Sequence, residues 1–510
     1  MIARRLGHSV ILLERGTHPR FAIGESSTPL ANLLLEQLAD RYDLPAIRPL
    51  AKWSSWRKAH PEIACGLKRG FTFYNHRFDQ LFVDELIEHG NELLVAASPH
   101  DGIADTHWYR PDLDHFLVQQ AQCAGVEYLD QATVSLSDET EDGALLGITR
   151  LGRTCSIRVR LLVDASGPRG FLHRALRLPE KSFPHYPATQ ALYAHFSDVK
   201  RWSARHHPSD PPPYPPDDAA VHHVFDGGWI WILRFANGLT SAGVAAHDQL
   251  AQELSLSDGN SAWSRLLDRL PSVRELFANA KLTTPFIHQP RLAFRASIAS
   301  GRSWIMLPSA VGVVDPLLST GIALTLLGIE RLGAVIEQGL RIESLANELA
   351  DLGTRTLSEL DATAGLIGAL YANFHDFEVF SALALLYFAA ASFSESARRL
   401  GGGEKARSFL LHDDPCFGPA LAACCRNALN IQTSAQRTAL IDTIHRTIEP
   451  FDVAGLGQLD RQNWYPALAE DFLGSAHKLG VSRIAAERAL IKSGFQLPDP
   501  VQSNGASCPG

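Results

Sequence analysis

Length and composition set the first limits on this chain. It has 510 residues, of which 45% are hydrophobic and 20% charged, so it can bury a large core and exceeds the usual size of one domain. The formal net charge is -8, and the Lys and Arg residues are scattered rather than clustered. This excludes the basic stripe with which proteins neutralise nucleic-acid phosphates, so nucleic acid is not an expected partner.

The cysteines and histidines exclude further classes. Seven cysteines, widely spaced and without a C-x-x-C pair, fit neither a disulfide framework nor a structural zinc site. Among the 21 histidines, the doublets His206-His207 and His222-His223 lack the spacing of metal ligands. The first residues lack the apolar core of a signal peptide, so we expect a cytoplasmic protein with reduced thiols.

The most apolar stretch lies in the C-terminal half. Residues 379–393 read VFSALALLYFAAASF, which is shorter than the ~20 residues needed to span a bilayer. We interpret this stretch as a buried helix, with a membrane contact as the alternative, and expect no transmembrane segment.

The N-terminus has the pattern of the second half of a βαβ unit. Residues 2–7 read as the end of a helix closed by Gly7, and residues 9–13 as a compact apolar strand that ends at Glu14. An acidic residue at this strand tip accepts ribose hydroxyls in dinucleotide-binding folds, which makes Glu14 a candidate ligand.

The first strand and the glycine-rich turn of such a unit are not found before residue 2. Those glycines let the backbone approach a pyrophosphate at a helix N-terminus. Either the true start lies upstream of Met1 or the protein has lost this phosphate cradle. We favour the first, since the remaining half-unit is otherwise intact.

Helix and strand patterns follow along the rest of the chain. We expect an amphipathic helix at 31–42, strands at 66–74 and 219–246, and a helix over 112–125. An apolar strand at 159–163 ends in Asp164 and a small-residue turn to Gly167, a position suited to a ligand at the carboxyl edge of a sheet. From about 323 the pattern is helical, with a break at 401–403.

Four separated stretches resemble one family, the flavin-dependent halogenases (tryptophan halogenase-like) and their FAD-dependent monooxygenase relatives. They are VILLERGTHPRFAIGES at 10–26, WYRPDLDHFLVQQAQCAGV at 108–126 with LLVDASGPRG at 161–170, GWIWILRF at 228–235, and VVDPLLSTGIALTL at 313–326. Their order and spacing match the family over roughly the first 345 residues, with the chain beginning inside the nucleotide-binding unit.

The resemblance implies an α/β fold with an FAD-binding Rossmann-like domain of the glutathione-reductase type, an inserted, mostly antiparallel β substrate domain and a helical C-terminal region. The FAD-binding domain would comprise residues 1–50, 105–180 and 296–345, and the substrate domain residues 51–104 and 181–295. Residues 346–500 would form the helical region, and 501–510 a disordered tail.

The resemblance also implies the FAD contacts. Glu14 would hold the adenosine ribose, Arg110 would lie near the FAD phosphates or ribose, and Asp164 and Gly167 would form the second nucleotide-contacting turn. The strap that runs past the isoalloxazine would contain Arg20, Gly24, Glu25 and Ser26.

The segment from Asp315 to Ile322 has a physical interpretation as well. Pro316 and Gly321 bracket a turn that leads into an apolar helix, whose free N–H groups would stabilise an anionic reduced flavin. In the family, backbone N–H groups here bind chloride near the flavin, which would carry over to Thr320 and Gly321. A tight turn that caps a core helix is compatible with this function.

Lys68 is the catalytic candidate, because it looks like the halogenase lysine that sits away from the flavin at the end of a tunnel. On one strand it would share a small or polar face with Gly66, Gly70 and Thr72. Such a lysine would polarise hypohalous acid, or become a haloamine, and direct electrophilic halogen to the substrate. An ordinary exposed strand lysine is the alternative.

Three positions depart from the family pattern. The tryptophan motif at 229–231 continues with Leu233-Arg234 where the family has Ile-Pro. In the family this motif is viewed as a block to monooxygenation, so the change puts halogenation in doubt; the alternative is that Trp229 and Trp231 are core aromatics of a strand. Residues 307–309 replace a Gly-Asp pair that contacts the flavin chain. Leu318 stands where tryptophan-specific halogenases carry a glutamate, so free tryptophan is not the expected substrate.

The expected function is that of a two-component halogenase. No second dinucleotide fingerprint is found, so reduced FAD would come from a separate flavin reductase. The other partners would be a halide ion and an electron-rich aromatic substrate, either a small molecule or carrier-bound. A flavin monooxygenase without halide use and a non-catalytic scaffold that has lost FAD are the alternatives.

Overall fold

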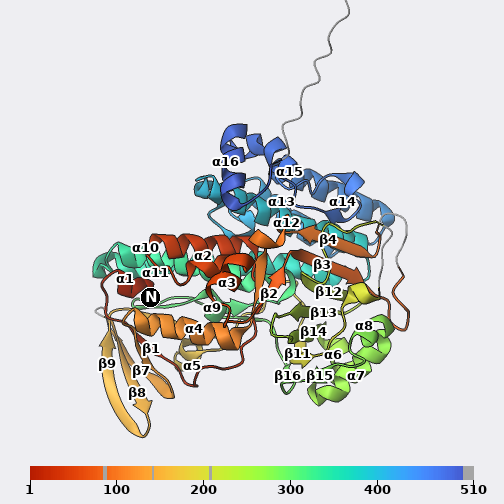
Figure 1. The fold of residues 1–510 in the computed structure, drawn as a ribbon. Coiled ribbons are helices and arrows are strands. Elements are labelled where there is room, and N and C mark those ends of the chain that lie inside the picture. The colour runs from red at the N-terminus through yellow and green to blue at the C-terminus, as the bar shows by residue number, and fades with distance from the viewer. Residues whose placement is uncertain (84–88, 141–142, 206–209, 498–510) are drawn as a thin grey trace, which may run out of the picture.

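The computed structural model describes residues 1–83, 89–140, 143–205 and 210–497. The tail expected to be disordered at 501–510 and the doublet His206-His207 lie outside these residues. The described chain forms an α/β region around the N-terminus, a nine-stranded sheet beside it and a layer of helices along one side of both (Figure 1).

The N-terminal region contains two parallel ladders. Strand β1 (Ile11–Leu13) pairs with β6 (Glu127–Leu129), and β10 (Leu162–Asp164) pairs with β18 (Trp304–Met306). The region includes the helices α1 (Ile2–Arg5), α4 (Arg110–Cys123) and α5 (Phe171–Ala175), and a projecting antiparallel sheet of β7 (Ala132–Thr140), β8 (Gly143–Arg150) and β9 (Arg153–Val159).

Most of the expected N-terminal elements are confirmed. The helix at 2–7, the strand at 9–13 and the helix at 112–125 correspond to α1, β1 and α4, and Gly7 adopts φ +87° where α1 ends. The expected strand at 159–163 is wrong in one respect. Val159 ends β9, which pairs with β8, whereas β10 starts at Leu162 and pairs with β18, so two different ladders divide that run.

The large sheet is mostly antiparallel. Its order is β15-β11-β14-β13-β12-β3-β4-β20, with β16 also paired to β11, and only the β12–β3 and β20–β4 pairs are parallel. The strands are β3 (Gly70–Asn75), β4 (Glu92–Ala96), β11 (Thr189–Ser197), β12 (Ala220–Phe225), β13 (Gly228–Arg234), β14 (Thr240–His247), β15 (Lys281–Leu282), β16 (Ile287–Gln289) and β20 (Trp464–Tyr465). All except β20 fall within 51–104 and 181–295; the domain boundaries themselves remain a prediction.

The remaining elements connect these regions. Short strands are β2 (Cys65–Lys68), β5 (Asp105–Trp108), β17 (Phe294–Arg295) and β19 (Gly312–Val313). The helices are α2 (Pro29–Arg41), α3 (Trp53–Ala59), α6 (Asp248–Glu253), α7 (Asn260–Arg269), α8 (Pro271–Leu276), α9 (Pro308–Val311), α10 (Thr320–Glu337), α11 (Ile342–Ala372), α12 (Phe377–Arg399), α13 (Phe417–Ala428), α14 (Ser434–Ile448), α15 (Ala469–Gly474) and α16 (Arg483–Ser493).

The single strand expected at 66–74 is wrong, because it is two strands. β2 pairs with β5, and β3 pairs with β4 and β12, with the break at Arg69, whose N–H donates to the Asp218 carbonyl at 2.6 Å. The expected face shared by Gly66, Lys68, Gly70 and Thr72 therefore does not exist as one surface. Instead, Lys68 Nζ lies 3.8 Å from the ring centroid of Phe71.

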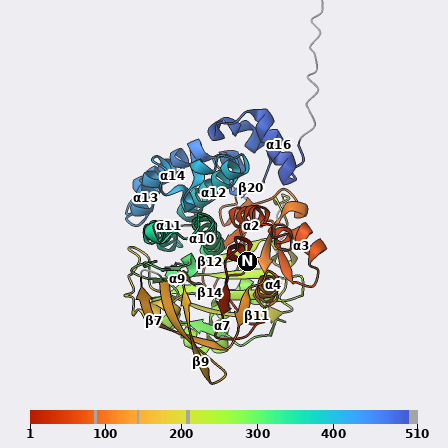
Figure 2. The ribbon, with the colours of Figure 1, turned by 90° about the vertical axis from the view of Figure 1, so that its left-hand side faces the viewer.

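Helix α12 covers one face of the large sheet. Phe380 packs edge-on against Phe73 at 5.6 Å between ring centroids, and Phe388 against Phe71 at 5.1 Å. In the view turned by 90°, the C-terminal helices form one layer, α2, α10 and α11 lie beneath them, and most of the strands lie lower still (Figure 2). The apolar sequence of α12 is thus explained by the aromatic face that it covers.

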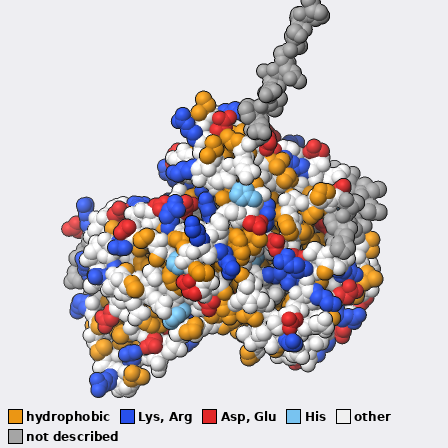
Figure 3. All heavy atoms as spheres, viewed as in Figure 1, with side chains coloured by type: hydrophobic (Ala, Val, Ile, Leu, Met, Phe, Trp, Pro, Cys, Tyr) orange, Lys and Arg blue, Asp and Glu red, His pale blue; other side chains and the backbone are white. Residues whose placement is uncertain are grey.

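Two described helices are long and apolar enough by composition to cross a membrane, Leu317–Glu337 and Phe377–Arg399. Of the most apolar 18 residues of each helix, 50% are buried inside the protein in Leu317–Glu337 and 83% in Phe377–Arg399. The buried helix expected at 379–393 is confirmed. On the face shown in Figure 3, basic and acidic side chains are interspersed.

Replacing Phe380 by alanine tests the packing of α12 on the sheet. The side chain is fully buried among Phe73, Phe374 and Phe377. We expect the free energy of unfolding to fall by about 3 to 5 kcal/mol, measured by urea denaturation and far-ultraviolet circular dichroism. The exposed control Ile491→Ala should change it by less than about 0.5 kcal/mol, and equal values for the two variants would contradict this packing.

Candidate functional site

The strap expected beside the flavin is fixed by Arg110 at the start of α4. Its guanidinium donates to the carbonyls of Ile23 at 2.9 Å and Gly24 at 3.1 Å, and forms a bidentate pair with Asp114. Gly24 adopts φ +97°, and a Cβ there would lie 3.2 Å from Arg110 Nη1. A side chain at this position would therefore disturb the strap, which explains the glycine.

Glu14 and Arg20 lie together at the carboxyl end of β1. Glu14 accepts a hydrogen bond from the Gly16 N–H at 2.7 Å, and its other oxygen is 3.4 Å from Arg20 Nη2. Both side chains are partly exposed, so a ligand can reach them.

The strap then runs inward along β5. Glu25 is buried, with Oε1 2.7 Å from His195 Nε2, while its Oε2 has no hydrogen-bond partner. Ser26 Oγ accepts a hydrogen bond from Lys68 Nζ at 3.0 Å, and the Ser27 carbonyl accepts another at 2.5 Å. The expected cofactor strap and the expected catalytic lysine are therefore in direct contact.

Lys68 is completely buried and faces a carboxyl group across the β2–β5 ladder. Its register partner is Asp105, whose Oδ1 accepts from Asn32 Nδ2 at 2.7 Å and whose Oδ2 has no hydrogen-bond partner. Burial lowers the pKa of Lys68 and raises the pKa of Asp105, and the charge of each partly opposes the shift of the other. The alternative of an ordinary exposed strand lysine is wrong.

The turn before α10 has an unusual backbone. Leu318 has φ 65° and Ser319 φ 54°, so two successive non-glycine residues are left-handed. Such conformations cost on the order of 1–3 kcal/mol each and persist where the surroundings hold them. Asp315 is part of that restraint, since Oδ1 accepts from the Leu317 N–H at 2.9 Å.

Asp315 also accepts from two tyrosines. The hydroxyls of Tyr371 and Tyr186 donate to its Oδ2 at 2.8 and 2.9 Å. Burial raises the pKa of Asp315 to about 6, against the lowering by these hydrogen bonds. At neutral pH the group is therefore mostly a carboxylate that accepts all three donors.

Thr320 and Gly321 form the first turn of α10. Thr320 is buried, and no atom lies within 4 Å of the place where a Cβ of Gly321 would be, so space is open beside the helix N-terminus. Ile322 follows, partly buried. The expected halide residues thus present free N–H groups at the positive end of an 18-residue helix.

Asp164 and Gly167 form a tight turn after β10. Asp164 accepts from the backbone N–H groups of Ser166 at 2.8 Å and Leu172 at 2.7 Å. Gly167 has φ +79° with open space around its Cβ position. Asp164 organises this turn, and Gly167 leaves its backbone accessible to a ligand.

The departures from the family pattern occupy structural positions. Trp229 and Trp231 are both buried on β13, where Arg234 donates to the Val199 carbonyl at 2.8 Å. Residues 307–309 form the start of α9.

The residues that sequence reasoning missed come from distant parts of the chain. Asp105 and Asn32 approach Lys68, His195 meets Glu25, and Tyr186 and Tyr371 meet Asp315. None belongs to a motif. Asp105 lies three residues before the second family stretch, which was the one available signal.

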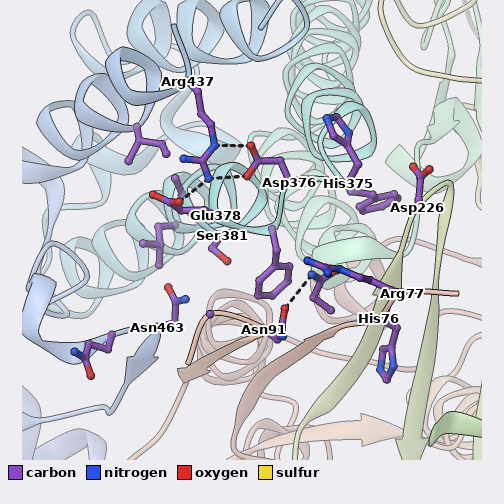
Figure 4. A pocket seen from close by; sticks show the side chains of 18 of the residues that line it. His76, Arg77, Asn91, Asp226, His375, Asp376, Glu378, Ser381, Arg437 and Asn463 are labelled. Carbon is purple, nitrogen blue, oxygen red and sulfur yellow. Dashed lines mark hydrogen bonds and ion pairs between the residues drawn. The ribbon is translucent and has the colours of Figure 1, made fainter. Parts of the chain in front are cut away.

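A separate cleft of about 1020 Å³ opens at the other end of β3. Arg437 reaches across to Asp376 at 2.6 Å and Glu378 at 2.5 Å, and Asn463 and Ser381 also line it (Figure 4). Its lining includes Asn75 at the end of β3 and residues of α12 and α14, whereas Lys68 lies before the start of β3. None of the expected site residues borders this cleft.

Among the described residues, no group of three or more histidines, cysteines or acids is arranged to hold a metal ion. The six described cysteines are free. A β-strand ending in an acid, a strap held by Arg110 of α4 and a helix N-terminus behind a restrained turn are features of a nucleotide-binding α/β fold.

The chain belongs to the tryptophan halogenase family, whose model matches residues 106–372. It is 26% identical over 400 residues to monodechloroaminopyrrolnitrin halogenase PrnC of Pseudomonas fluorescens, covering 74% of this chain and 66% of that one. It is 29% identical over 359 residues to tetracycline 7-halogenase of Kitasatospora aureofaciens, covering 68% and 62%. The chain therefore spans just under two thirds of the length of these relatives.

The fold is shared with solved halogenases. Halogenase PltM in complex with phloroglucinol and FAD superimposes with a TM-score of 0.78 at 21% identity, covering 90% of this chain and 95% of that one. Flavin-dependent brominase Bmp2 gives a TM-score of 0.59 at 20% identity, covering 84% and 94%. The expected α/β fold of an FAD-binding halogenase, with a β-rich insertion and a helical C-terminal region, is confirmed.

The buried histidines beside Lys68 predict a pH dependence of stability. Burial lowers the pKa of His222 to about 3, so the folded chain binds fewer protons than the unfolded chain between pH 6.5 and that value. Stability is therefore lost as pH falls through this window. His222→Asn keeps a donor near the Thr72 carbonyl and should reduce the loss between pH 6.5 and 4 by about 3 kcal/mol.

The measurement is urea denaturation at several pH values. The same substitution at His375, whose side chain is exposed, provides the surface control. If the free energy of unfolding of His222→Asn fell with pH as steeply as that of the wild type, the burial of a neutral imidazole at this position would be contradicted.

Proposed function

We propose that the protein is a flavin-dependent halogenase that uses reduced FAD, oxygen and a halide on an electron-rich aromatic substrate. The observation that carries the proposal is the contact of buried Lys68 with the strap, through Ser26 Oγ and the Ser27 carbonyl. This contact places the buried lysine of the β2–β5 ladder directly against the strap that is expected to lie beside the cofactor.

The residues present fit FAD. Open space lies at the Cβ positions of Gly167 and Gly321, and the buried Glu25 Oε2 lacks a partner. Glu14 would hold the adenosine ribose, and Arg110 would lie near the FAD phosphates or ribose. The remaining contacts would come from Arg20, Gly24, Glu25, Ser26, Asp164, Gly167, Asp315, Pro316, Gly321 and Ile322. When bound, reduced FAD supplies the electrons with which oxygen becomes able to oxidise a halide.

The halide would lie at the N-terminus of α10. Backbone N–H groups of Thr320 and Gly321 have no partner within the first turn of a helix, and the helix dipole favours an anion there. The restrained turn before them keeps these groups oriented without reorganisation.

Lys68 would hand the halogen to the substrate. As an ammonium it would donate a hydrogen bond to the oxygen of hypohalous acid and polarise the O–X bond. As a free amine it would take the halogen itself, R–NH2 plus HOX giving R–NHX plus H2O. Burial lowers its pKa and so increases the amine fraction near neutral pH, which supports the second route.

The side chains around Lys68 suggest the class of substrate. Phe71 lies beside Lys68, and its ring centroid is 6.3 Å from that of Tyr387, so an aromatic substrate that reached the lysine would meet aromatic side chains. The relatives include a chlorinase of a carrier-bound pyrrole, so a carrier-bound aromatic belongs to the same substrate class. We further propose a separate flavin reductase as electron donor and a cytoplasmic location.

The decisive experiment supplies the purified protein with FAD, a flavin reductase, a nicotinamide cofactor and a panel of phenols and pyrroles, with and without bromide or chloride. We expect halogenated products that require halide. In Lys68→Met, their formation should fall at least about 100-fold, as when a proton-transferring group is lost. Mass spectrometry of the products gives the rate.

Exposed Lys58 on α3 provides the matched control, since Lys58→Met removes the same charge outside the site. Its activity should equal that of the wild type. Hydroxylated product without any need for halide would instead identify a monooxygenase, the function that the altered end of the tryptophan motif at Arg234 favours.

A further inference from the structure

A buried chain of hydrogen bonds links the tryptophan motif to the turn before α10. Trp229 Nε1 donates to the Tyr371 hydroxyl oxygen at 3.1 Å, and Tyr371 donates onward to Asp315 Oδ2 at 2.8 Å. Asp315 in turn accepts from the Leu317 N–H at 2.9 Å. Three regions of the sequence therefore meet at one carboxylate, and all three side chains are at least nine-tenths buried.

The direction of each hydrogen bond in this series is fixed by the group that donates it. An indole N–H can only donate, so the Tyr371 oxygen has to accept it. The single hydroxyl hydrogen of Tyr371 is then directed to Asp315, which has no hydrogen to give as a carboxylate. Replacing Tyr371 by phenylalanine would leave both Trp229 and Asp315 without this partner while keeping the ring.

The turn that follows Asp315 needs such a restraint. Leu318 and Ser319 both have positive φ, and backbone of this kind persists only where neighbouring groups over-determine it. Leu318 is fully buried, so its side chain cannot relax into solvent. The hydrogen bond from Leu317 to Asp315 ties the start of this strained segment to the buried network.

We propose that Tyr371, oriented by Trp229, is a positioning residue that fixes Asp315 and thereby holds the turn in the conformation that presents Thr320 and Gly321 to the halide. The inference rests on the proposed halogenase function. It gives the helical C-terminal region a part in the reaction site, because Tyr371 belongs to α11. It also gives the first tryptophan of the motif at 229–231 a specific task.

The neighbouring tryptophan supplies a matched control. Trp231 lies on the same strand, with its ring centroid 5.6 Å from that of Trp229, and is also buried. Its Nε1 donates to Ser241 Oγ at 3.2 Å on β14 instead, outside the network. For the tyrosine, buried Tyr214 donates to the Phe71 carbonyl and has no contact with the turn.

The experiment compares Tyr371→Phe and Trp229→Phe with the controls Trp231→Phe and Tyr214→Phe. At saturating FAD and reductase, we expect the KM for bromide to rise about tenfold in Tyr371→Phe, which corresponds to about 1.4 kcal/mol. Trp229→Phe should shift it in the same direction by less, because Tyr371 can still reach Asp315. The two effects should not add in the double variant, since both act through one hydrogen-bond chain.

A direct binding measurement keeps the test independent of turnover. FAD dissociation constants from fluorescence titration should rise in Tyr371→Phe relative to Tyr214→Phe, while the thermal midpoints of these two variants stay equal. If Tyr371→Phe does not fold, the comparison of Trp229→Phe with Trp231→Phe carries the same test.

Failure of the proposed function and failure of the positioning role give different results. A wild-type protein without halogenation in any assay would overturn the proposed function, and the FAD titrations would still test the network. A bromide KM and an FAD dissociation constant in both network variants within about twofold of their controls would overturn the positioning role.

Discussion

Lys68 carries an amino group, which is charged in water, into a part of the protein that water does not reach. Removing a charge from water is unfavourable unless hydrogen bonds and an opposite charge replace the lost hydration. Ser26 and Ser27 of the strap provide the acceptors, and Asp105 provides the opposite charge from the neighbouring strand. The strap and β2 are therefore tied together, since moving either one would leave the lysine unsatisfied.

That constraint extends to the elements around it. The strap is held from the other side by Arg110 at the start of α4, and Asp105 is held by Asn32 of α2. The strap also has a polar contact with the large sheet, since Glu25 lies 2.7 Å from His195 on β11.

Local sequence patterns predicted elements whose signals lie within their own residues. The apolar run before Glu14 predicted β1, although its partner β6 is distant in sequence, and the segment from Pro316 to Gly321 predicted the turn into α10. The break at Arg69 could not be predicted, because it depends on a hydrogen bond to Asp218, which is distant in sequence. Asp105 and Tyr371 reach the site only through tertiary pairing, and the helical region has no motif that would have revealed Tyr371.

Strand β20 adds Trp464 and Tyr465 to one edge of the large sheet. β20 pairs in parallel with β4, and Trp464 stacks on His89 at 3.7 Å between ring centroids. Without it, the backbone groups of β4 would face solvent as an open edge, which is where sheets recruit strands from other molecules. The C-terminal segment that carries β20 therefore closes this edge of the sheet against pairing with a strand of another molecule.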